Sequence, residues 1–232
     1  MLKSRENGSN KNLLLTLSIT FSIFVASCNN LPKLPTAREI VDESLNTLHV
    51  LKARADLKLF NSQLRNAAGV AIFPSVYRAG FFVGAEGGNG ILLAKNQSGT
   101  WGHPGFYSLA SGSWGLQFGG QKSGIIFIIR SPGAVKSLID HQGKISAGMD
   151  VAAGKIGTSL KGGITTNLGG DIIAYSDSKG LFSGVALEGS ALIRRNDLNQ
   201  QYYGQIATPE DIIINDKFEN QHANNLRRTL SD

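Results

Sequence analysis

The sequence is poor in the residues that most often build metal and redox centres. Its 232 residues include one cysteine, Cys28, so no disulfide can form within a single chain. The four histidines, His49, His103, His141 and His222, are dispersed, and their spacing matches no zinc site. We therefore expect no metal and no cofactor, and we interpret the histidines as surface residues.

Concentrated positive charge is also absent. Residues 1–27 hold three basic residues and one acidic residue, so the rest of the chain carries +4 of the formal charge of +6. The nearest approaches to a basic run are two pairs, Arg194-Arg195 and Arg227-Arg228. This balance is too weak to indicate nucleic acid as a partner, but it is compatible with anionic lipid headgroups.

Motifs for catalysis and for phosphate binding are lacking as well. A serine nucleophile needs a G-x-S-x-G elbow together with a histidine and an acid, and Ser111-Gly112-Ser113 lacks that pattern. The glycine-rich stretch Gly84–Gly90 leads into a predicted strand, whereas a phosphate-binding loop leads into a helix. We predict a hairpin turn there, with Asn89-Gly90 supplying positive φ, and we expect that the protein is not an enzyme.

The first 27 residues are expected to be a signal peptide that is cleaved. Three basic residues precede Leu13–Val25, an uncharged and mostly apolar stretch that is too short for a permanent membrane-spanning helix. Val25-Ala26-Ser27-Cys28 resembles the bacterial lipobox, which implies that Cys28 is lipidated and becomes the new N-terminus. A plain secretory signal or an uncleaved anchor, with an incidental cysteine, is the alternative.

Residues 28–35 are then expected to form a lipidated tether. More than one acyl chain gives stable anchoring, since burial contributes ~0.8 kcal/mol per CH₂. Asn29 follows the cysteine where an aspartate often retains lipoproteins in the inner membrane. The lipobox resemblance therefore implies attachment in the bacterial envelope, at the outer membrane and facing the periplasm.

The remaining chain predicts helices followed by a glycine-rich sheet. Thr36-x-x-Glu39 is a capping box that predicts one or two helices between Ala37 and Arg65. All but one of the 28 glycines then lie between Gly69 and Gly204, among short β-branched and aromatic runs. The predicted strands are Gly69–Phe73, Gly80–Ala85, Gly90–Ala94, Phe106–Leu109, Trp114–Phe118, Ile125–Arg130, Ser146–Ala152, Gly170–Tyr175 and Leu181–Leu187.

Two further helices are predicted from N-cap patterns. Ser131-Pro132 places a capping serine before a proline at the first helical position, and Thr208-Pro209 repeats this order. Residues 36–215 are expected to form one domain, and residues 216–232 a polar tail that is either helical or disordered. The fold class is α+β and mainly antiparallel β. We expect a curled sheet or barrel-like sandwich of short strands, with N-terminal helices and a short C-terminal helix.

Several motifs of this domain match a known family in the same order along the chain. They are Ala68–Pro74, Ala79–Gly84, Gly88–Leu92 with Trp101-x-x-Pro104, Ser113–Gly120, Tyr175–Gly189 and Asn199–Gly204. Over about residues 37–215 the chain resembles the SYLF lipid-binding domain, in the form of a bacterial lipoprotein member. The resemblance implies a non-catalytic domain that binds phospholipid, notably phosphoinositides in eukaryotic relatives, some of which also bind actin.

The leading hypothesis is a membrane-anchored lipoprotein whose domain binds anionic phospholipid headgroups. Its candidate headgroup ligands are Arg78, Lys155, Lys161 and Lys179, each near the end of a predicted strand. A well-placed cation near an anionic membrane contributes ~1 kcal/mol. Each of these residues could equally be a solvated surface charge.

The alternative is an envelope structural or protein-interaction lipoprotein without specific lipid binding. Its surface for an envelope protein partner would be built from exposed aromatic side chains. The candidates are Trp101, Phe106, Tyr107 and Trp114.

Overall fold

The structure describes most of the chain beyond residue 33. The computed structural model describes residues 34–55, 57, 59–80, 83–114, 121–140, 151–153, 171–177 and 190–232. The chain divides into two units, Met1–Pro35 and Thr36–Asp232. Cys28 and the expected signal peptide lie outside the described residues.

The second unit begins with two helices, as predicted. Helix α2 (Ala37–Lys52) starts at the capping box: the Glu39 N–H donates to Thr36 Oγ1 at 3.3 Å, and the Thr36 N–H donates to Glu39 Oε2 at 2.6 Å. Helix α3 (Phe60–Arg65) follows. The apolar stripe of α2 is buried and includes Ile40, Val41, Leu48 and Leu51.

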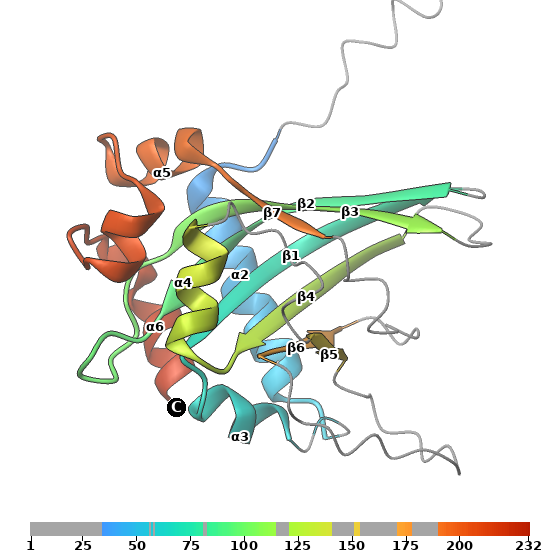
Figure 1. The fold of residues 1–232 in the computed structure, drawn as a ribbon, viewed down its shortest axis with the longest axis horizontal. Coiled ribbons are helices and arrows are strands. Elements are labelled where there is room, and N and C mark those ends of the chain that lie inside the picture. The colour runs from blue at the N-terminus through green and yellow to red at the C-terminus, as the bar shows by residue number, and fades with distance from the viewer. Residues whose placement is uncertain are drawn as a thin grey trace, which may run out of the picture. The chain divides into compact units, whose positions relative to one another are not determined.

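Seven strands form one open sheet (Figure 1). They are β1 (Gly69–Gly80), β2 (Val83–Ala94), β3 (Gly105–Trp114), β4 (Gln121–Ile129), β5 (Val151–Ala153), β6 (Ile172–Ser176) and β7 (Ala191–Arg194). Their order is β5-β6-β4-β1-β2-β3-β7, and all neighbours are antiparallel except β5 and β6. The predicted α+β class with a mainly antiparallel sheet is confirmed, and the described strands form no closed barrel.

The prediction of a turn at Asn89-Gly90 was wrong. Strand β2 runs through both residues, and neither has positive φ. The irregularity lies instead in β1, which has one residue more than β2 and β4 around Pro74-Ser75, so both registers shift there. A bulge tolerates a proline that cannot donate to the ladder. A Cβ at Gly88 would lie 2.2 Å from the Ser75 carbonyl oxygen, so glycine is needed for the close approach of the bulged strand.

The predicted strand Gly80–Ala85 was wrong as one strand, because Gly80 ends β1 and Val83–Ala85 begin β2. Phe106–Leu109 is part of the longer β3, and all of Ile125–Arg130 except Arg130 is part of β4. The predicted strand Leu181–Leu187 lies outside the described residues, as do residues 115–118 and 146–150 of two others.

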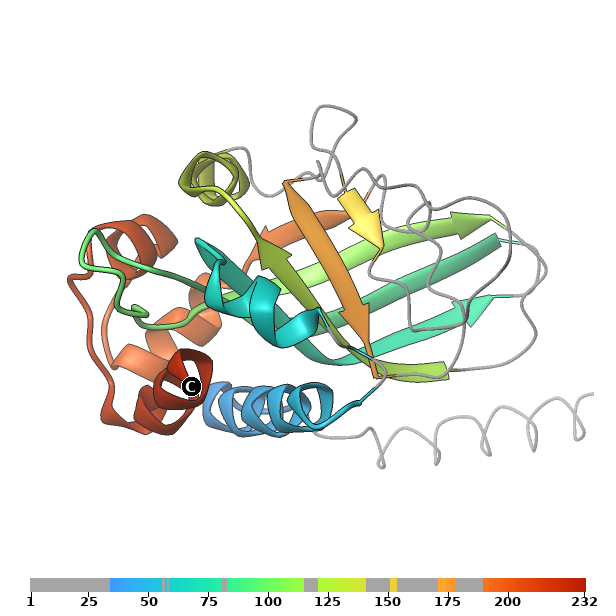
Figure 2. The same ribbon diagram turned by 90° about the horizontal axis from the view of Figure 1, so that it is seen from below.

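Helices cover both faces of the sheet (Figure 2). Helix α2 packs on one face with α5 (Asn196–Tyr203) and α6 (Asn224–Ser231). Helix α4 (Pro132–Asp140) and the π-helical turn η3 (Glu210–Ile214) pack on the other. Successive residues of β1 alternate between the two cores, as the pleat of a strand requires.

The helix predicted after Ser131-Pro132 is confirmed as α4. Ser131 Oγ accepts the N–H of Ala134 at 3.1 Å, and Pro132 is the first helical residue. The segment predicted after Thr208-Pro209 forms η3, where Thr208 Oγ1 accepts the N–H of Asp211 at 3.2 Å.

Residues 216–232 end in helix, which was one of the two predicted alternatives. The 3-10 turn η4 (Gln221–Ala223) leads directly into α6. Leu226 and Leu230 of α6 are 1% and 2% exposed and belong to the core beneath α2. Two leucines four residues apart on one face are therefore enough to dock this polar segment.

Candidate functional site

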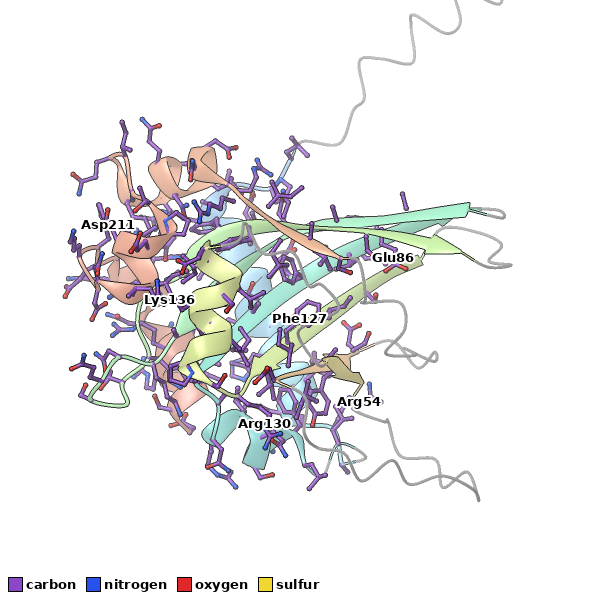
Figure 3. The ribbon with its side chains drawn as sticks, in the orientation of Figure 1. Arg54, Glu86, Phe127, Arg130, Lys136 and Asp211 are labelled. Atoms are coloured by element: carbon purple, nitrogen blue, oxygen red, sulfur yellow. The ribbon has the colours of Figure 1, made fainter. Side chains whose placement is uncertain are left out.

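The predicted headgroup ligands are not brought together within the described residues. Lys155, Lys161 and Lys179 lie outside those residues, and of Arg78 only the backbone is described. In register, Arg78 stands opposite Glu86 of β2. Glu86 is 5% exposed and lies in the outer half of β2, away from the helices (Figure 3). Residues opposite each other in an antiparallel pair share a face, so Arg78 has a buried acidic residue as its cross-strand neighbour.

The aromatic residues proposed as an exposed partner surface are mostly core. Trp101, Phe106 and Tyr107 are 1%, 0% and 0% exposed, and the side chain of Trp114 is not described. They are buried because α5, α6 and η3 cover both faces of the sheet around the start of β3. The prediction that these three side chains are exposed was wrong.

His103 was also wrongly interpreted as a surface residue. It is 3% exposed, and its Nδ1 accepts the N–H of Asn220 at 3.3 Å. Burial, followed by the nearby guanidinium of Arg227, lowers the pKa of His103. The imidazole thus serves as a neutral acceptor that fixes the segment leading into α6. His49 is exposed as expected, and His141 lies outside the described residues.

Five cations gather where the C-terminal ends of α2 and α3 meet α6. We call this group the basic end. It consists of Lys52, Arg65, Lys95, Arg227 and Arg228. These residues come from four segments that are distant in the sequence, and α6 contacts both α2 and α3.

Three hydrogen bonds hold the basic end together. Lys52 Nζ donates to the carbonyl oxygen of Thr229 at 2.8 Å, in the last turn of α6. Lys95 Nζ donates to the carbonyl of Arg65 at 2.7 Å, at the C-terminus of α3. Ammonium groups at helix C-termini complete the free carbonyls and favour the negative end of the helix dipole. Arg227 Nε likewise donates to a main-chain carbonyl, that of Trp101, at 2.8 Å.

Carboxylates do not neutralise this group in the part of the chain that the structure describes. The ion pairs found there involve other residues, and Arg228 donates instead to the amide oxygen of Asn225 at 2.6 Å. Across the described residues of 44–70, 95–105 and 223–232, Asp232 is the single acidic residue. Asp216 and Glu219 lie on the Arg227 side of the group, near His103, but neither of these described residues forms an ion pair with it. A backbone carbonyl positions a cation but carries no formal charge, so the basic end keeps a net positive charge.

Lys95 lies against the ring of Trp101. Its Nζ lies 5.0 Å from the centre of the Trp101 ring, and burial lowers its pKa. An aromatic face attracts a cation without accepting its proton. The buried ring of Trp101 therefore contacts Lys95 and does not form an exposed aromatic surface.

The opposite end of α2 has the opposite character. Glu39, Asp42 and Glu43 lie in its first two turns, and the Ala37 N–H there donates to Gln201 of α5 at 2.7 Å. A helix of 16 residues is about 24 Å long. The unit is therefore electrically polar along α2, acidic where the N-terminal segment joins it and basic at the far end.

Other kinds of site are absent from the residues described here. No three His, Cys, Asp or Glu side chains among them are grouped as metal ligands would be. Of the helices that could be searched, none combines the length and the apolar character needed to cross a bilayer. The basic end is the strongest local feature that remains.

Known proteins resemble this chain over most of the second unit. Protein YSC84 of Saccharomyces cerevisiae (strain ATCC 204508 / S288c) is 36% identical over 154 residues, which are 65% of this chain and 32% of that protein. The yeast LAS seventeen-binding protein 3 of the same strain is also 36% identical over 154 residues, covering 65% and 33%. The human SH3 domain-containing YSC84-like protein 1 is 34% identical over 169 residues, covering 72% and 49%. The chain thus spans between a third and a half of the length of these relatives.

The family comparison agrees with these relatives. The sequence model described as "Ysc84: Las17-binding protein actin regulator" matches residues 110–232, from the middle of β3 to the end of α6. The match covers more than half of the chain and includes Arg227 and Arg228 of the basic end. Together with the strand motifs that resemble the SYLF domain, it shows that this chain belongs to the Ysc84/SYLF family.

Proposed function

We propose that this protein is a membrane-anchored, non-catalytic lipoprotein that binds anionic phospholipid headgroups through the basic end. The observation that carries the proposal is the convergence of five cations, four of which donate to main-chain carbonyls or a side-chain amide and not to carboxylates. Cations near an anionic membrane contribute ~1 kcal/mol each. Phosphate oxygens would supply the negative charge that the surrounding side chains lack.

A lipid on Cys28 would make this weak attraction effective. A single acyl chain gives marginal binding, and stable attachment needs a second signal such as another chain or a basic patch. The lipobox-like Val25-Ala26-Ser27-Cys28 supports the first signal, and the basic end supports the second. We place the protein in the bacterial envelope, at the periplasmic face of the outer membrane. Intact-mass analysis of the native protein should find Cys28 acylated and N-terminal; an unmodified thiol would exclude this anchor.

Vesicle flotation tests headgroup binding. The full mature chain, residues 28–232 with Cys28→Ala, should float with phosphatidylglycerol-containing vesicles at low salt and should be released as the ionic strength rises. Adding Arg65→Glu and Arg228→Glu should weaken binding by roughly 30-fold or more, since two contributions of ~1 kcal/mol are lost and reversed. Both side chains are exposed, so the fold should tolerate the changes.

The matched control carries Lys122→Glu and Lys136→Glu, which change the net charge equally at exposed positions outside the basic end. It should bind within about threefold of the parent, because screening confines each charge to about 10 Å at 0.1 M salt. Equal losses in both variants would show that net charge alone drives binding. No flotation of the parent would refute headgroup binding by this domain.

A further inference from the structure

Two exposed apolar side chains accompany the cations of the basic end. Val50, two residues before Lys52, is 44% exposed, and Leu59, the residue before α3, is 55% exposed. Large apolar side chains exposed singly are common on protein surfaces. These two differ because they lie close in sequence to cations for which the described residues provide no ion-pair partner.

The exposure of Leu59 is imposed by well-packed neighbours. Leu57 and Phe60 on either side are 4% and 0% exposed, and the Phe60 ring meets Tyr175 edge-on at 4.9 Å. The Leu59 carbonyl accepts the N–H of Gln63 at 2.9 Å, in the first turn of α3. The Leu59 side chain therefore projects from a fixed backbone and is not part of a frayed end.

The end of α2 shares this rigid frame. Asn61 Nδ2 donates to the carbonyl of Lys52 at 3.4 Å, which joins the first turn of α3 to the last turn of α2. Val50 and Leu59 consequently belong to the two helix ends that this contact connects. Val50 lies in the last turn of α2 with Lys52, and Leu59 lies at the start of the six-residue helix that ends at Arg65.

We propose that Leu59 and Val50 enter the interfacial layer of an anionic bilayer when the basic end binds headgroups. This inference rests on the proposed function and adds to it an apolar contact and an orientation. Phosphates would meet the cations while the two apolar side chains reach the boundary with the acyl chains, as in peripheral proteins that combine both attractions. Burial of apolar side chains of this size is favourable, so even partial insertion adds measurably to binding.

The orientation places the acidic end of α2 away from the lipid. Ile206 supplies an internal comparison, because it is 82% exposed, more than Leu59. It lies five residues beyond Gln201, hence within about 17 Å of the residue that binds the start of α2. Exposure alone would favour Ile206 as the contact, whereas charge favours Leu59.

Tryptophan fluorescence separates these possibilities. Leu59→Trp and Ile206→Trp are made separately in the full mature chain carrying Cys28→Ala and are mixed with phosphatidylglycerol vesicles that contain brominated acyl chains. After subtraction of the parent spectrum, Leu59→Trp should shift to the blue and lose at least a third of its emission to bromine. Ile206→Trp should change by less than a tenth. Both variants are assayed for flotation in parallel.

The flotation result distinguishes the two proposals. If the variants float but Leu59→Trp is not quenched, insertion is refuted while headgroup binding stands. Quenching of Ile206→Trp instead would reverse the orientation and also refute the inference. A blue shift of Leu59→Trp that grows with protein concentration without vesicles would assign this surface to a second copy of the chain. If nothing floats, headgroup binding fails and insertion fails with it.

Discussion

The cations of the basic end are held differently from three cations that form ion pairs elsewhere on the described surface. Arg54 and Arg194, outside the basic end, also donate to main-chain carbonyls, those of Ser176 and Asp177 and that of Ile139. The three that pair with carboxylates are Lys136 with Asp140 at 2.8 Å, Arg195 with Asp197 at 2.6 Å and Lys217 with Asp211 at 2.7 Å. At the basic end they donate to carbonyl oxygens. A carboxylate fixes a cation and cancels its charge, whereas a carbonyl only fixes it. The surface with the most available charge is therefore also a well-ordered one.

Displacing α6 from the core should have the largest effect on the basic end, because it removes two of the five cations. Leu226→Ala empties a site that is 1% exposed beneath α2, and such truncations cost about 2–5 kcal/mol. We expect the free energy of unfolding to fall by that amount in urea titrations. Vesicle binding at a temperature where the variant is still folded should fall about tenfold as Arg227 and Arg228 lose their position.

Ile206→Ala is the control, since it removes a similar side chain from an exposed site. Its free energy of unfolding should stay within about 0.5 kcal/mol of the parent value. Unchanged stability of Leu226→Ala would mean that α6 does not dock in solution. Lower stability with unchanged vesicle binding would show that Arg227 and Arg228 do not contribute to lipid binding.

The basic end could not be predicted from the sequence, whereas two helix caps could. The capping box at Thr36 and the serine cap before Pro132 are contained in a few consecutive residues, and both were predicted correctly. Lys52, Arg65 and Lys95 are single cations in unremarkable contexts, and only folding brings them to the Arg227-Arg228 pair. That pair was visible in the sequence, but its meaning depends on the docking of a tail that could equally have been disordered.

The sheet teaches a related lesson about glycine. Asn89-Gly90 has the residues of a tight turn, and the local pattern alone favours one. The residue that decides is Pro74, on the neighbouring strand, because its bulge needs space on β2 that Gly88 provides. A glycine used for close approach and a glycine used for a turn look the same until strand pairing is known.

Removing one carboxylate from an ion pair outside the basic end should have a smaller effect, and it should change stability and not vesicle binding. Hydrogen bonds from Lys217, then Asn215 and Thr208, lower the pKa of Asp211 to about 2 from its ordinary 3.8. The folded state therefore holds the carboxylate more strongly than the unfolded state does. This stabilisation is complete above pH 4 and is lost as the pH falls through about 2.

Asp211→Asn should consequently be less stable than the parent at pH 6, with the difference shrinking between pH 4 and pH 2. Urea unfolding at three pH values measures it. Asp140→Asn, which removes a carboxylate with a single lysine partner, is the comparison for the loss of one exposed ion pair at pH 6. A pH-independent difference for Asp211→Asn would mean that its hydrogen bonds, and not its charge, carry the effect. Vesicle binding should not change in either variant, because both lie outside the basic end.

The smallest expected effect concerns Lys95, where burial lowers the pKa from its ordinary 10.5 and the Trp101 ring replaces a counter-ion. Between the folded pKa and 10.5 the unfolded chain binds more protons than the folded chain, so stability should rise with pH in that window. Lys95→Met keeps the apolar stem and removes the proton, so the rise should be absent from it. Urea unfolding of both proteins at pH 8, 9.5 and 10.5 makes the test, with Lys136→Met as control because its pKa is raised by Asp140. An identical pH dependence in the parent and Lys95→Met would show that Lys95 is solvated like any surface lysine. Lys95 would then no longer serve as an example of a cation held by a carbonyl and an aromatic ring in place of a carboxylate.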